Sequence, residues 1–64
     1  MITSKQVNLL LARFIASGVV GDRTRMDWLY ERGIDCEQDS RGHPYYEAMT
    51  NQQLNRALKD LEAE

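Results

Sequence analysis

Apolar residues recur at helical spacing in the first quarter of the chain. They form one stripe, made of Val7, Leu10, Leu11, Phe14 and Ile15. Spacings of three and four place such residues on one face of an α-helix. Thr3 or Ser4 can cap the first turn, and Gly18 can end the helix in the left-handed conformation. The pattern therefore predicts a first helix whose stripe belongs to the core.

A second helix is predicted to follow the Gly-Asp turn signal and to end at Gly33. Either Asp22 or Thr24 can cap its start. Gly33 suits the position just past the helix, where Ile34 can close back on the last turn in a Schellman ending. The helix has two marked faces, one with Met26, Leu29 and Tyr30 and the other with Arg25, Trp28 and Arg32.

The next segment has the alternation and turn residues of a β-hairpin. Ile34 and Cys36 point one way and the acidic residues between them the other. The sequence Asp-Ser-Arg-Gly at 39–42 suits a type I turn, and residues 43–46 can return as a second strand. Pro44 has no N–H, so it belongs on the outer edge. Of Tyr45 and Tyr46, one should pack and the other be exposed, and the hairpin should pack on the helices.

A last helix is predicted from Thr50, with Gln53 completing a capping box. Its apolar row has two interpretations: it covers the core of one chain, or it forms a seam between two copies. The row consists of Leu54, Leu58 and Leu61. Three leucines fall short of a sustained heptad pattern, which favours the core without excluding a homodimer.

The order helix, helix, hairpin, helix predicts a single small domain over residues 1–64, of α+β class and mostly helical, similar in plan to a winged helix-turn-helix. A chain of 64 residues that is 42% hydrophobic and 28% charged is globular rather than disordered. Its single cysteine, Cys36, favours a reducing, intracellular setting. No apolar run is long enough to span a membrane and no secretory signal is evident, so we expect a cytoplasmic protein without a membrane partner.

Charge is unevenly distributed along the chain. The net charge is −2. Residues 1–34 contain five basic and three acidic side chains, whereas residues 35–64 contain three basic and seven acidic ones. An acidic chain is not the usual footprint of a nucleic-acid binder. The acidic second half therefore keeps a protein partner among the alternatives.

At residue level, the segment 23–44 resembles a family of very short phage and prophage proteins of uncharacterised function. The shared pattern is a basic helix start, Trp-Leu, a Gly-Ile helix exit and a turn with Asp, Gly and Pro, here Arg23, Trp28-Leu29, Gly33-Ile34, Asp39, Gly42 and Pro44. That family is similar to excisionase-like winged-helix proteins, which act beside an integrase. The resemblance implies an accessory DNA-binding protein, a recombination-directionality factor or a regulator. The acidic hairpin departs from the basic wings usual in such proteins.

Under this hypothesis, double-stranded DNA would contact the start of the second helix and the hairpin tip. The candidate contacts are Arg23, Arg25, Arg32, Arg41 and His43. A helix N-terminus also offers free N–H groups to a phosphate. Arg32 can instead stack on Trp28, four residues earlier.

The alternative hypothesis is a protein–protein interaction module, such as a phage-encoded inhibitor of a host protein. Its candidate contacts with a partner or a second copy are Trp28, Leu54, Leu58 and Leu61. Cys36 and His43 are too few for a structural zinc site, and no catalytic constellation or phosphate-binding loop is evident. We therefore expect no enzyme activity, no metal and no cofactor.

Overall fold

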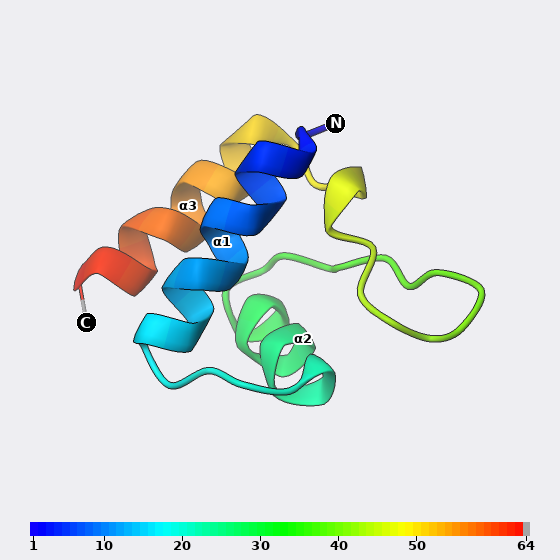
Figure 1. The fold of residues 1–64 in the computed structure, drawn as a ribbon, viewed down its shortest axis with the longest axis horizontal. Coiled ribbons are helices and arrows are strands. Elements are labelled where there is room, and N and C mark those ends of the chain that lie inside the picture. Colours follow the sequence, from blue (N-terminus) through cyan, green and yellow to red (C-terminus); the bar gives the residue numbers. More distant parts are fainter. Residues whose placement is uncertain (64) are drawn as a thin grey trace.

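The computed structural model describes residues 1–63, whose regular structure is entirely helical. It consists of α1 (Ser4–Ala16), α2 (Asp22–Glu31), the 3-10 turn η1 (Tyr46–Ala48) and α3 (Asn51–Ala63). Helices α1 and α3 run side by side in the same direction, and α2 lies beneath them (Figure 1). Gln6 and Asn51 join the starts of the parallel pair through a 2.9 Å hydrogen bond. The Ser17 hydroxyl donates to the Leu61 carbonyl at the other end, at 3.4 Å.

The helix starts follow the sequence prediction at α1 and α3 but not at α2. Thr3 and Gln6 form a capping box at α1, and Thr50 and Gln53 form the predicted one at α3. At α2 the predicted cap by Asp22 or Thr24 is wrong. Gly21 takes the cap position with φ 97°, and its carbonyl accepts the Arg25 N–H at 3.0 Å. Asp22 therefore lies inside the first turn, where its side chain is free to bond elsewhere.

Both of the first two helices end in a Schellman motif, in which a left-handed glycine reverses the chain. In α2, the Ile34 N–H donates to the Leu29 carbonyl at 2.9 Å, and the Gly33 N–H donates to the Tyr30 carbonyl at 3.0 Å. The predicted ending is confirmed, and it directs residues 34–36 back along the helices. Ile34 is consequently buried and Cys36 packs against the core.

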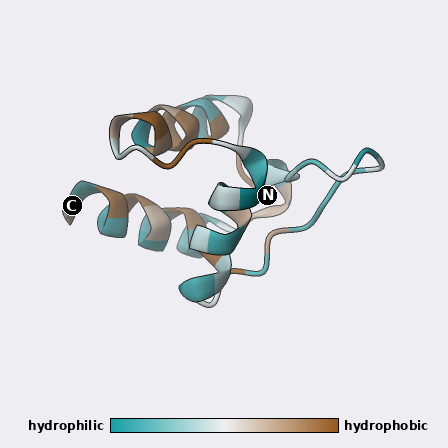
Figure 2. Cartoon of the chain, turned by 90° about the horizontal axis from the view of Figure 1, so that it is seen from below, coloured by the Kyte–Doolittle hydropathy of each residue, from teal (hydrophilic) through white to brown (hydrophobic). Residues whose placement is uncertain are grey.

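The predicted β-hairpin, and with it the α+β winged-helix class, is wrong. Within residues 1–63 there is no sheet, and residues 37–45 form a loop with one antiparallel bridge, Gln38 to Pro44. The turn itself is present, since the Gly42 N–H donates to the Asp39 carbonyl at 3.0 Å. The ladder stops because Pro44 has no N–H and Tyr46 already begins η1. This segment, the 37–45 loop, projects from the helices and is mostly hydrophilic (Figures 1 and 2).

The core gathers side chains from every element around Phe14, which is fully buried. Trp28 meets its ring edge to face, with centroids 5.4 Å apart, and Tyr46 lies 6.5 Å away. Tyr45 is exposed, so the prediction that only one of the two tyrosines packs is confirmed. The other buried apolar residues are Ile2, Val7, Leu10, Val19, Leu29, Ile34, Met49, Leu54, Ala57 and Leu61.

One member of the predicted core stripe lies outside the core. Ile15 is 63% exposed, and Leu11 is only partly buried. The stripe spans a wider arc of α1 than α2 and α3 can cover, so its edge faces solvent.

None of the helices described is long and apolar enough to cross a membrane.

Replacing Phe14 by alanine should lower the free energy of unfolding by about 3–5 kcal/mol, because the substitution leaves a cavity where three elements meet. In a domain this small that loss approaches the whole stability. The measurement is urea denaturation followed by circular dichroism.

The matched control is Ile15→Ala, one residue further along the same helix. It should change the free energy of unfolding by no more than about 0.5 kcal/mol, because the side chain is mostly exposed. Equal losses in the two variants would contradict the packing described here.

Candidate functional site

Arg25 lies on α2 with its side chain turned toward the core. Its Nε–H donates to the Val19 carbonyl at 3.0 Å, and its guanidinium carbon lies 5.6 Å from the centroid of the Phe14 ring. The hydrogen bond satisfies a carbonyl in the turn between α1 and α2. This predicted DNA contact therefore holds two helices together.

Arg32, just past α2, is also engaged inside the protein. Its guanidinium stacks 3.6 Å from the Trp28 ring centroid, which confirms the predicted cation–π contact. Its Nη1–H donates to the Trp28 carbonyl at 3.0 Å, and its Nε pairs with Asp60 of α3 at 3.2 Å. Only 22% of the Arg32 side chain is exposed. Arg32 therefore joins α2 to α3 and has little surface with which to contact a nucleic acid.

The His43 side chain faces α2 and contacts it at Asp22. Its Nδ1 lies 2.6 Å from Oδ2 of Asp22 at the start of that helix. The hydrogen bond to Asp22 is the main cause that raises the pKa of His43 above its usual 6.5, and the carboxylate's charge adds to it. The imidazole is thereby one point at which the 37–45 loop contacts the helical body.

Three of the five predicted basic contacts remain open to solvent, since the His43 side chain is 60% exposed even though it is bonded to Asp22. The Arg23 side chain is 89% exposed and makes a loose pair with Asp27, with Nε and Oδ2 3.7 Å apart. Arg41 is exposed in the 37–45 loop, and among the described residues its guanidinium has no hydrogen bond or ion pair. The structure thus divides the predicted DNA surface, leaving Arg23, Arg41 and His43 as its accessible members.

The predicted partner contacts lie mainly in the core. Trp28, Leu54 and Leu61 are buried, and Leu58 is partly buried against the same cluster. The row on α3 therefore covers the core of a single chain. Only Leu58 retains surface that a second copy could touch.

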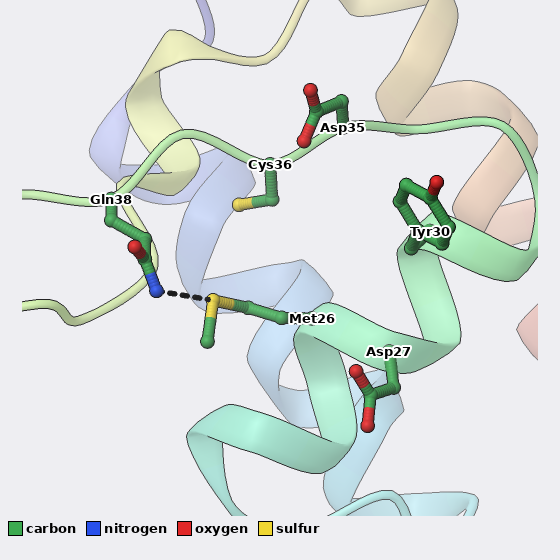
Figure 3. A pocket seen from close by; sticks show the side chains of 6 residues that line it. All are labelled: Met26, Asp27, Tyr30, Asp35, Cys36 and Gln38. Carbon is green, nitrogen blue, oxygen red and sulfur yellow. Dashed lines mark hydrogen bonds between the residues drawn. The ribbon is translucent and has the colours of Figure 1, made fainter.

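The outer face of α2 borders a hollow of about 280 Å³ that sequence reasoning missed. It is lined by Met26, Asp27, Tyr30, Asp35, Cys36 and Gln38. We call it the Tyr30 hollow; Figure 3 shows these side chains on α2 and on the segment that carries Asp35, Cys36 and Gln38. Tyr30 is 72% exposed, so an aromatic ring stands in solvent beside two carboxylates.

The sequence pattern placed Tyr30 on the same face as Leu29, and that grouping is wrong. Leu29 and Trp28 point inward, whereas Tyr30 shares the outward face with Asp27, three residues earlier. The inward face is completed by Arg25 and Arg32, two residues that a hydrophobicity pattern counts as polar. The acidic residues around Tyr30 were the available signal for its exposure.

The chemistry of the hollow is set by the side chains that line it. Burial is the main cause that raises the pKa of the Cys36 thiol, with the charges of Asp35 and Glu37 adding to it, so the thiol stays protonated at neutral pH. Among residues 1–63, no group of three or more His, Cys, Asp or Glu side chains is placed to hold a metal ion. The groups on offer are an aromatic face, a thioether, an amide and carboxylates.

No protein-family model, curated protein or solved structure matches the chain. The resemblance to excisionase-like proteins therefore stays a prediction from the sequence.

We expect a mixed-sequence duplex of about 30 base pairs to show no saturable binding in about 0.15 M salt, up to about 100 µM protein. Arg25 and Arg32 are engaged inside the protein, the exposed His43 is bonded to Asp22, and the net charge is −2. Fluorescence anisotropy of the labelled duplex measures this.

The opposite result has a clear signature. Micromolar binding that falls steeply with salt and disappears in an Arg23→Ala, Arg41→Ala double variant would restore the DNA hypothesis through those two residues. Each substitution removes about one phosphate-neutralising charge and so lowers the salt dependence.

Proposed function

We propose that this protein is a protein-interaction module that binds an arginine-bearing segment of a partner through the Tyr30 hollow. The observation that carries the proposal is the exposed Tyr30 ring beside the carboxylates of Asp27 and Asp35. An exposed aromatic side chain has no packing role, and here it lines a hollow whose charged members are all acidic.

Arginine is the side chain that these groups suit best. Its planar guanidinium stacks on an aromatic face and forms two parallel hydrogen bonds with a carboxylate. Within the protein itself, Arg32 stacks on Trp28 and pairs with the Asp60 carboxylate through its Nε. The Tyr30 hollow would offer the same two contacts to a guanidinium from outside.

The existing pair at the hollow leaves Asp27 available. Arg23 lies 3.7 Å from its carboxylate, and both side chains are largely exposed. Such pairs contribute about 0–1 kcal/mol and are screened by salt. A partner's guanidinium that also stacks on Tyr30 can therefore displace Arg23.

The size of the hollow indicates a single anchoring side chain rather than a whole small molecule. Ligand pockets enclose about 300–1,000 Å³, and this one is smaller and open. Glu31 and Glu37 are exposed on the same two segments, so the surrounding charge favours a basic partner. Electrostatic complementarity of this kind mainly raises the association rate and the specificity.

A short arginine peptide, acetyl-Gly-Arg-Gly-amide, should shift backbone amide resonances of residues 26–38 in the ¹⁵N-labelled protein. The glutamate peptide of the same length should not, because the hollow repels it. Tyr30→Ala should weaken the arginine peptide about two- to fivefold, the range of an exposed cation–π contact. Tyr30→Phe keeps the ring and should retain most of the affinity.

Glu62→Gln is the matched control for charge. It removes an exposed carboxylate from α3, away from the hollow, where it forms only a 3.7 Å pair with Arg13. Shifts that spread evenly over all acidic residues, or that depend on Glu62 as much as on Asp27 and Asp35, would show non-specific attraction and overturn the proposed site.

A further inference from the structure

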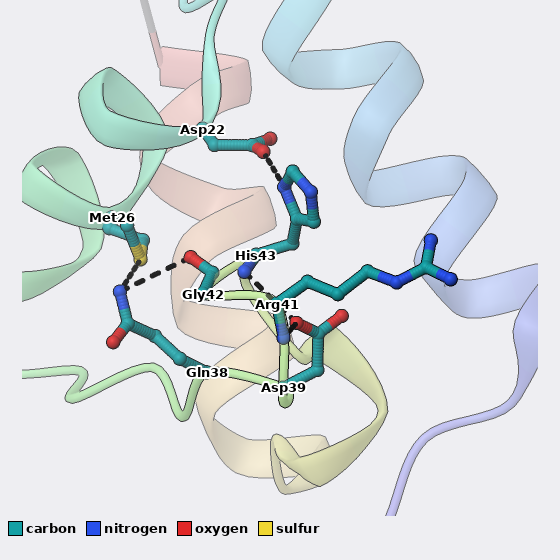
Figure 4. Close-up of polar contacts among 7 residues, drawn as sticks. All are labelled: Asp22, Met26, Gln38, Asp39, Arg41, Gly42 and His43. Carbon is teal, nitrogen blue, oxygen red and sulfur yellow. Dashed lines mark hydrogen bonds and ion pairs between the residues drawn. The ribbon is translucent and has the colours of Figure 1, made fainter.

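The 37–45 loop supplies one wall of the Tyr30 hollow and is anchored to α2 at two points. Gln38 lines the hollow, and its Nε2 lies 3.5 Å from the Met26 sulfur. His43 makes the second anchor, on Asp22 at 2.6 Å. Figure 4 shows both contacts reaching from one loop to one helix.

Internal hydrogen bonds make the loop a single unit. One Asp39 carboxylate oxygen accepts the N–H groups of Arg41 and His43 at 2.8 and 3.0 Å, and these bonds lower the pKa of Asp39. The Asp39 N–H donates to the His43 carbonyl at 2.8 Å. Gln38 also donates to the Gly42 carbonyl at 3.3 Å. A displacement at His43 is therefore transmitted to Gln38.

We propose that the His43–Asp22 contact is a pH-dependent tether that holds Gln38 in place and so controls the Tyr30 hollow. The proposal rests on the function proposed above, because it concerns the regulation of that same site. With His43 protonated, both partners of the tether are charged, and the attraction of opposite charges strengthens the hydrogen bond. With His43 neutral, the charge is lost and the loop is held less firmly.

The two charged groups that raise the pKa of His43 are both acidic. Asp22 faces the imidazole from α2, and Asp39 adds a smaller negative charge from the loop itself. Of the nearby basic groups, Arg25 is bonded to the Val19 carbonyl, and the Arg41 guanidinium extends away from the imidazole (Figure 4). Both acidic neighbours therefore favour the protonated ring.

The direction of the pH dependence follows from linkage. The folded protein raises the pKa of His43 above its usual 6.5. The stabilisation is fully present below the unfolded pKa and is lost as the pH rises through the folded value. The tether is consequently strong at mildly acidic pH and weakens through neutrality.

The test is an NMR titration from about pH 5.5 to 8.5, across the usual histidine range. It follows the His43 Cε1–H together with the Gln38 side-chain amide and the Met26 methyl group. We expect all three to change with one midpoint, above 6.5. In Asp22→Asn the His43 midpoint should fall toward 6.5, and in His43→Gln the Gln38 and Met26 signals should stop responding in this range. Gln38 and Met26 signals that stay constant while His43 titrates would overturn the tether.

The arginine peptide separates this proposal from the function on which it rests. In about 0.15 M salt, direct charge effects are screened beyond about 8 Å. Under these conditions the protein's affinity for the peptide should be at least about twofold lower (~0.4 kcal/mol) at the alkaline end of the titration than at the acidic end. In His43→Gln the affinity should not change. Equal affinity for the peptide at both ends of the pH range would contradict the proposal that the tether controls the hollow. A peptide that binds at neither end overturns the proposed function, while the coupled NMR midpoints still decide the tether.

Discussion

The packing of Trp28 against Phe14 is the contact on which the rest of the structure depends. Phe14 is fully buried and lies where α1, α2 and η1 meet, and the edge-to-face ring pair fixes which side of α2 points inward. That side also carries Arg25 and Arg32. Their aliphatic stems can be buried because each guanidinium finds an aromatic ring and a hydrogen-bond acceptor, which meets the cost of placing a charge near the core.

Turning two arginines inward decides what α2 presents to solvent. Arg25, Trp28 and Leu29 lie on or near the inner face of α2, and Arg32 follows just past its end. The exposed residues of the helix then include Tyr30, Asp27 and Glu31, and Arg23 is the basic residue among them. The same contact that builds the core thus removes basic charge from the surface. This arrangement is the basis on which we propose a basic partner for a chain whose sequence suggested a basic recognition helix.

Local signals in the sequence predicted the helix boundaries well, because capping boxes and Schellman glycines act within a few residues. The Thr50–Gln53 box and the Gly33 ending are examples. The hairpin prediction was wrong although the predicted alternation of apolar and acidic residues is present. Pro44 and the start of η1 at Tyr46 leave room for only one bridge among the described residues. The surroundings of the candidate site residues were hard to predict for a different reason. The stacking of Arg32 on Trp28 follows from their spacing of four residues, and it was predicted. The contact of Arg25 with Phe14 and the pairing of Arg32 with Asp60 join residues distant in sequence, and no periodicity reveals them.

The most direct measurement is hydrogen exchange at the arginine Nε–H groups, resolved by ¹⁵N NMR at low pH and temperature. If the inward arginines build the core, the Nε–H groups of Arg25 and Arg32 give separate, slowly exchanging signals, because they are hydrogen-bonded to Val19 and paired with Asp60. Those of Arg23 and Arg41 should exchange as fast as in a free peptide. Fast exchange at all four would contradict the structure's central feature and return Arg25 and Arg32 to the surface.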